Sequence, residues 1–181
     1  AQKARTREAF LASGHANAAL TFDLLDRALE TAHASWVRAH DDACARRARG
    51  AEPAGLAEKR SACLEEHRRE VERFVSLLTE TDTLSAEQSP SAIWQMSRLD
   101  DCMNERVLAG RAPRGRDDLA TALVETRALH TAGRYDRGLA VAEQAVASAR
   151  GADEPRMLAL LLIELGLEQQ EAFRFSEAED S

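Results

Sequence analysis

Two histidine–cysteine pairs are the residues whose types and spacing could carry chemistry. His40 and Cys44 are four residues apart, and Cys63 and His67 repeat the spacing in the opposite order. If each pair lies on a helix, its two side chains project from the same helical face. An antiparallel pairing of the two helices would then bring all four side chains together.

Three arrangements of these residues are open on spacing alone. Cys44 and Cys63 could form a disulfide between closely packed helices. All four side chains could bind Zn²⁺ as a Cys₂His₂ site, although the spacing matches no common zinc finger. The thiols could also be small apolar side chains beside half-exposed histidines. Cys102 is then either free or bonded to a partner outside this chain. Apart from this zinc alternative, we expect no cofactor.

A long helical hairpin is predicted to position these pairs. Residues 16–49 contain neither Pro nor Gly, and their apolar residues recur at steps of three, four and seven. Gly and Pro within residues 50–55 interrupt this pattern. A second amphipathic helix is expected to follow as far as about residue 81.

The turn between these helices sets which residues face one another. A turn centred at residues 53–54 places Cys44 opposite Cys63, and Trp36 opposite Val71. With this choice of turn the two apolar stripes also lie face to face. Because one choice of turn aligns both the cysteines and the apolar stripes, the pattern favours the hairpin.

The composition favours an all-α fold. The chain has 181 residues, of which 4% are aromatic, and Ala is the most abundant residue. With 24 basic and 31 acidic residues the net charge is −7, which argues against a nucleic-acid partner. The longest apolar run, residues 157–163, is far shorter than the ~20 residues that span a bilayer. The composition therefore argues against a nucleic-acid partner and against a membrane span in this segment.

Three regions follow from these patterns. Residues 1–81 hold an N-terminal helix and the hairpin. Residues 82–116 are predicted to be a helical connector, with a short helix over 92–98 and a loop over 110–115. Residues 117–181 have the character of helical repeats.

The last region resembles the tetratricopeptide repeat. In residues 132–138, Gly133 and Tyr135 match the turn between the two repeat helices, whereas Gly138 stands where Ala is usual. A second match begins at residue 159, with Phe173 in place of the turn glycine. The resemblance implies two helix pairs, the second truncated.

The resemblance also implies where a partner binds. Tyr135, Phe173 and Phe175 are the candidate partner-binding residues. The truncated repeat should expose an apolar face, because repeat arrays bury their core by stacking neighbours. That face could meet a following repeat or form a homodimer.

The first half resembles a region of large myxobacterial-type Ser/Thr protein kinases, which follows the kinase domain and precedes tetratricopeptide repeats. The residues that carry this resemblance are residues 9–14, Trp36, Ala43, Cys44, Arg60, Cys63, Leu64 and Cys102. The resemblance implies a non-catalytic sensor or protein-interaction segment that binds a peptide or protein. The kinase motifs themselves are absent from this sequence, so we expect no enzyme activity here.

The kinase resemblance favours the Cys44–Cys63 disulfide among the three arrangements. A disulfide indicates an oxidising compartment, such as the extracytoplasmic side of a membrane-anchored kinase, with the cytoplasm as the alternative. Two other functions compete with the kinase segment. One is a scaffold region of a repeat-containing signalling ATPase or regulator, and the other is a metal-binding or thiol-redox module built on Cys44 and Cys63.

Overall fold

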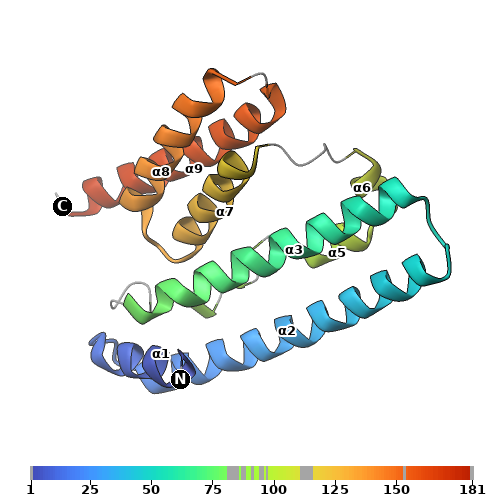
Figure 1. Ribbon diagram of the computed structural model, residues 1–181. Coiled ribbons are helices and arrows are strands. Elements are labelled where there is room, and N and C mark those ends of the chain that lie inside the picture. The colour runs from blue at the N-terminus through green and yellow to red at the C-terminus, as the bar shows by residue number, and fades with distance from the viewer. Residues whose placement is uncertain are drawn as a thin grey trace.

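The computed structural model describes residues 2–80, 86, 89–90, 92–93, 96, 98–110, 116–152 and 154–179, with side chains as far as residue 173. Within these residues the structure contains helices and no strands, which confirms the predicted all-α class (Figure 1). In chain order the elements are α1 (Gln2–Ala12), α2 (Ala18–Ala48), α3 (Ala54–Leu77), η1 (Leu78–Glu80), α5 (Leu99–Met103), α6 (Glu105–Gly110), α7 (Asp117–Thr131), α8 (Tyr135–Arg150) and α9 (Pro155–Glu179).

The long antiparallel hairpin is formed by α2 and α3 (Figure 1). Gly50 adopts a φ of 60° in the connecting turn, a conformation that glycine reaches without steric cost. Arg46 and Arg47 lie in the last turn of α2, where positive charge is favourable at the negative end of the helix dipole.

Helix α3 is central to the molecule and packs against α2, α5, α6 and α7. It therefore buries residues on more than one side, including polar residues such as His67 and Glu70. At its C-terminal end, Phe74 joins a core with Phe10 of α1 and Phe22 of α2. The rings of Phe10 and Phe22 meet edge to face, with centroids 5.7 Å apart.

Helix α5 is fixed to the other end of α3 by buried polar groups. Arg60 is 0% exposed and forms an ion pair with Glu52 at 2.8 Å. The same guanidinium donates a hydrogen bond to the carbonyl oxygen of Cys102 at 2.9 Å. Because a buried charge is costly unless it is paired, this arrangement holds α5 in a defined position.

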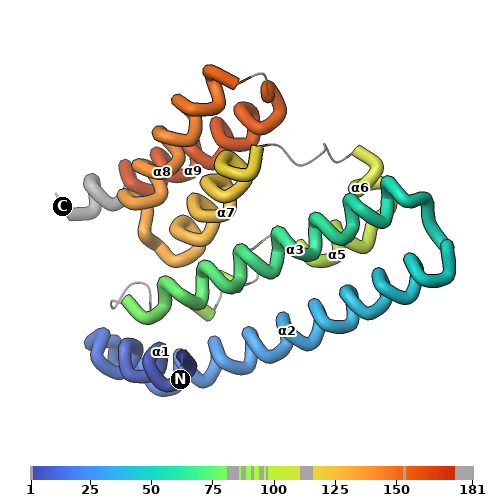
Figure 2. Tube along the Cα trace, in the orientation of Figure 1, coloured from blue at the N-terminus to red at the C-terminus, as the bar shows by residue number. Residues whose placement is uncertain are grey.

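Helices α7, α8 and α9 pack against one another and form a second layer, which contacts the hairpin through α7 and α3 (Figure 2). Gly133, with a φ of 69°, closes the turn between α7 and α8. The core of this layer contains Leu119, Leu123, Val146 and Leu161. Among the described residues, no helix is long and apolar enough to cross a membrane.

The repeat resemblance places a turn between two helices at Phe173, and this expectation is wrong, since α9 continues through this position to Glu179. The physical reason is local: residues 167–179 contain no Gly or Pro and are rich in Glu, Gln and Ala, which favour helix. In the connector, the structure gives α5 and α6. Most of the helix predicted over 92–98 and of the loop predicted over 110–115 lies outside the described residues.

Candidate functional site

The predicted disulfide between Cys44 and Cys63 is wrong. Cys63 is bonded to Cys102, with Cα atoms 5.4 Å apart, and Cys44 is free and exposed. Helix α2 instead turns Ala39 and Ala43 toward α3. Cys44 follows Ala43 by one residue and so points about 100° around the helix from it.

The register of the hairpin explains this difference. Helix α2 ends at Ala48 and α3 begins at Ala54, so the turn is centred near residue 51, two to three residues before the predicted 53–54. As a result the indole Nε1 of Trp36 donates a hydrogen bond to the carbonyl oxygen of Leu64 at 2.9 Å, and does not lie opposite Val71.

The alternative zinc site is not assembled either. His40 stacks on the ring of Trp36 with centroids 4.9 Å apart, and Cys44 lies beside it on the exposed side of α2. His67 is buried on α3, and the sulfur of Cys63 is already bonded. In the part of the chain that is described, no group of three or more His, Cys, Asp or Glu residues could hold a metal ion.

The predicted partner-binding residues lie in the second layer. The ring of Tyr135 contacts that of His130 edge to face, at a centroid distance of 5.5 Å. Phe173 is 64% exposed. The side chain of Phe175 lies outside the described part of the chain.

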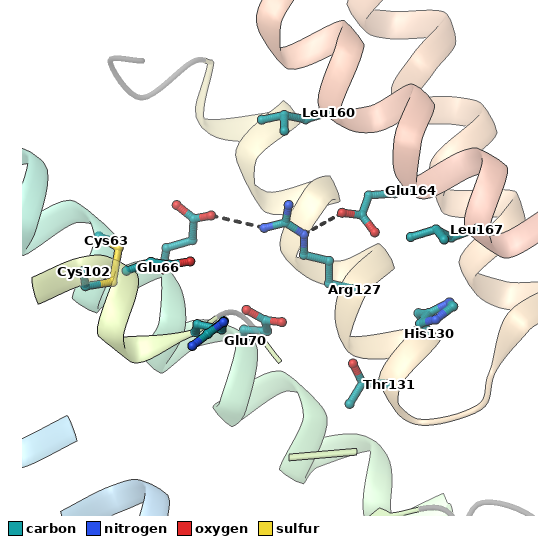
Figure 3. Close-up of a pocket in the computed structure, with 12 residues that line it drawn as sticks. Cys63, Glu66, Glu70, Cys102, Arg127, His130, Thr131, Leu160, Glu164 and Leu167 are labelled. Atoms are coloured by element: carbon teal, nitrogen blue, oxygen red, sulfur yellow. Dashed lines mark hydrogen bonds and ion pairs between the residues drawn. A yellow bond between two sulfur atoms is a disulfide. The ribbon is translucent and has the colours of Figure 1, made fainter. Parts of the chain in front are cut away.

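A cleft of about 530 Å³ lies between α3, α5, α7 and α9 (Figure 3). It is lined by Cys63, Glu66, Glu70, Arg98, Asp101, Cys102, Arg127, His130, Thr131, Leu160, Glu164 and Leu167. Its apolar wall is the pair of leucines on α9, and most of its remaining lining is charged or polar. Its size is in the range of known ligand pockets.

Arg127 occupies the middle of the cleft and joins three helices (Figure 3). Its Nε lies 2.7 Å from a carboxylate oxygen of Glu164 on α9, and its Nη1 lies 3.5 Å from one of Glu66 on α3. Burial lowers the pKa of Arg127, but the charges of Glu164, Glu70 and Glu66 outweigh it and raise the pKa above its ordinary value. The guanidinium is therefore charged and connects the hairpin to α9.

A second ion pair joins a histidine of the cleft lining to a buried glutamate. The Nδ1 of His130 is 3.4 Å from Oε1 of Glu168, whose side chain is 1% exposed. The interaction with Glu168 raises the pKa of His130, and burial raises the pKa of Glu168. Neither carboxylate oxygen of Glu168 accepts a hydrogen bond from the residues described.

Gly138 makes room for this buried carboxylate. A Cβ atom at Gly138 would lie 2.6 Å from the carboxyl carbon of Glu168. This close approach explains why glycine stands where the resembling repeat has alanine. Glycine in place of alanine at position 138 therefore indicates, from the sequence alone, that α8 makes an unusual contact here. It does not identify Glu168 as the residue contacted.

The comparisons with known proteins identify no relative: no family matches the chain, and neither a curated protein nor a solved structure matches it. What the fold establishes is an all-helical protein. The likenesses to tetratricopeptide repeats and to the kinase region rest on the motifs alone.

Proposed function

We propose that this chain is a non-catalytic protein-interaction segment that binds a peptide or protein in the cleft between α3, α7 and α9. The observation that carries the proposal is the pairing of an apolar wall, Leu160 and Leu167, with the charged cluster around Arg127. The two leucines are 40% and 42% exposed.

The chemistry of the cleft suits an amphipathic peptide. The two leucines are seven residues apart and so lie on one side of α9, where apolar side chains of a bound segment can pack. Glu66 and Arg127 face the same space and can pair with charged or polar groups of that segment. Recognition through a few apolar and charged anchors is typical of helical grooves.

We further propose that the segment belongs to a multidomain bacterial Ser/Thr protein kinase, outside its catalytic domain. The motif resemblance in the first half supports this assignment. The Cys63–Cys102 disulfide is compatible with an extracytoplasmic position, because disulfides persist in oxidising compartments. The coding sequence that flanks this segment tests the assignment, which requires a kinase domain upstream.

A scaffold region of another signalling protein would share the same binding cleft and differ in its neighbouring domains. The thiol-redox alternative has no support, because the free thiol of Cys44 and the disulfide of Cys63 do not form one site.

A displayed peptide library panned on the immobilised chain tests the binding function. We expect enriched peptides to share apolar residues and a charged residue, and to bind the Leu160→Asp/Leu167→Asp double variant at least tenfold more weakly. The matched control is Leu20→Asp/Leu24→Asp, which changes two exposed leucines of α2 and should leave binding unchanged.

Failure to enrich any such motif would contradict the proposal. So would binding that survives the α9 double variant, or that falls equally in the α2 control.

A further inference from the structure

The cleft between α3, α5, α7 and α9 carries an excess of negative charge. Among the described residues that line it, the carboxylates are Glu66, Glu70, Asp101 and Glu164, and the guanidinium groups are Arg98 and Arg127. His130 also lines the cleft, and its Nδ1 lies 3.4 Å from a carboxylate oxygen of Glu168, which balances a proton on the imidazole. A cleft lined mainly by one sign of charge attracts groups of the opposite sign.

Arg127 does not cancel this charge, because one guanidinium faces several carboxylates (Figure 3). It contacts Glu164 and Glu66 directly, and the charge of Glu70 acts on it as well. These carboxylates raise the pKa of Arg127 although its burial lowers it. The pKa of His130 is also raised, by Glu168 and by further carboxylates of α9. Both groups inside the cleft therefore experience a negative potential.

The carboxylates and the apolar surface lie on different walls of the cleft (Figure 3). Glu66 and Glu70 are four residues apart on α3 and so share one face of that helix, whereas Leu160 and Leu167 belong to α9. Helix α5 adds Asp101 to the negative wall. The side chain of Glu66 is 29% exposed and Asp101 is half-buried, so a bound molecule can reach both carboxylates.

From this arrangement we propose that the cleft selects a basic partner. The partner is an amphipathic segment of another protein, whose Lys or Arg side chains pair with Glu66 and Asp101 while its apolar side chains pack on the leucines of α9. The inference rests on the proposed peptide-binding function, and it adds the sign of the partner's charge and the orientation of the segment. An acidic segment would bring like charges together, which suppresses binding. The net charge of −7 steers a basic partner toward the chain in the same way.

The peptides enriched from the displayed library test the sign of the charge. We expect Lys and Arg to be more frequent in them than in the unselected library, and Asp and Glu to be less frequent. The tightest-binding peptide is then synthesised in three forms, with Lys, with Gln or with Glu at its basic positions. Affinity should fall in that order, by at least tenfold from the Lys form to the Glu form. This difference should shrink as salt is added, because ions screen exposed charges.

A control with the same change in net charge separates the cleft from the overall charge of the chain. Glu66→Gln/Asp101→Asn removes two negative charges from the cleft. Asp41→Asn/Glu58→Gln removes two from exposed positions of α2 and α3 outside it. The cleft variant should bind the Lys form at least tenfold more weakly and the Gln form almost unchanged, which a merely misfolded variant would not do. The control variant should bind both forms within twofold of the unmodified chain.

Carbodiimide cross-linking locates the contact without any variant. A water-soluble carbodiimide activates a carboxylate, which forms an amide with a lysine amine that touches it, and the reagent leaves as a urea. We expect the Lys form to be joined to Glu66 or Asp101, as peptide mapping by mass spectrometry would show. Cross-links found only on α2 would overturn the proposal.

The outcomes distinguish this inference from the function on which it rests. If the library yields no enriched peptide, both are overturned. If enriched peptides depend on Leu160 and Leu167 but carry acidic residues, the cleft binds peptides and the basic selection is overturned. Equal affinity of the three peptide forms, or an equal loss of the Lys form in the cleft and control variants, would also overturn the selection alone.

Discussion

Replacing Gly138 by alanine should destabilise the protein, although alanine is the better helix former at this position inside α8. The added Cβ would lie 2.6 Å from the carboxyl carbon of Glu168. That carboxyl group ends a flexible side chain, but the residue is 0% exposed and its partner His130 is fixed on α7. The carboxylate therefore cannot move aside without losing its ion pair or displacing its neighbours.

The expected magnitude is the difference between two opposing effects. Overpacking a buried site costs about 1–3 kcal/mol. Replacing glycine by alanine inside a helix contributes about 1 kcal/mol of stability. The net effect of Gly138→Ala should therefore be a loss of roughly 1 kcal/mol.

Gly138→Ala should change the free energy of unfolding in the opposite direction when the side chain of Glu168 is shortened. In a Glu168→Ala background the space beside Gly138 is free, so Gly138→Ala should stabilise the protein by about 1 kcal/mol. The two residues would then show a coupling energy of roughly 2 kcal/mol in a double-mutant cycle. Urea unfolding of the four proteins, followed by circular dichroism at neutral pH, measures this coupling.

Equal effects of Gly138→Ala in both backgrounds would refute the reasoning, because they would mean that Glu168 does not fill the space beside α8. Stabilisation in the wild-type background would refute it too. The slope of free energy against urea should be the same for all four proteins, which confirms that the comparison concerns the folded state.

Two further predictions concern pH and the disulfide. The pKa of His130 in the folded protein is raised above 6.5. The contribution of His130 to the free energy of unfolding is therefore full below pH 6.5 and is lost as the pH rises through this raised pKa. The raised pKa of Glu168 likewise makes the protein less stable as the pH rises. The urea midpoint should therefore fall as the pH rises above about 6.5, and His130→Gln should flatten that dependence. An equally steep profile in the variant would assign the pH dependence to other groups. Reducing the Cys63–Cys102 disulfide should lower the free energy of unfolding by about 2–4 kcal/mol, because 39 residues of sequence separate the two cysteines. Peptide mapping without reductant should join Cys63 to Cys102, and a peptide joining Cys44 to Cys63 would contradict this structure.

The hairpin was predictable from the sequence because its signal is local. Residues 16–49 have a helical apolar period and no helix breaker, and both properties act within a few turns. The register of the two hairpin helices was not predictable from the sequence. Ala43 and Cys44 are both small, so the apolar pattern does not show which of them faces α3. Only the position of the turn decides this, and a shift of one residue rotates the helix face by about 100°.

The partner of Cys63 was unpredictable for a related reason. Cys102 lies in a stretch without a strong period, and its position depends on the buried pair of Arg60 and Glu52 and on a hydrogen bond to its own carbonyl oxygen. These contacts join residues far apart in the chain. Spacing along the chain does not reveal them.

The cleft was missed because its charges look like a solvated helix face. Glu164 and Glu168 are four residues apart, a pattern typical of exposed positions, yet both are buried. Their partners, Arg127 and His130, lie on α7 and are brought near them only by the packing of α7 against α9. The one local signal was Gly138, whose missing side chain makes room for a contact that the sequence does not name.

The orientation of α9 turns the carboxylates of Glu164 and Glu168 inward and leaves Ile163 exposed. Residues 157–163 are apolar at every position, and a helix that is apolar on all sides is normally covered on all sides. Here the inner side is held by Leu161 in the core and by the buried ion pairs of Glu164 and Glu168. Rotating the helix to hide Ile163 would separate Glu164 from Arg127 and Glu168 from His130, and breaking a buried ion pair costs several kcal/mol. The ion pairs thus hold the helix with Ile163 exposed.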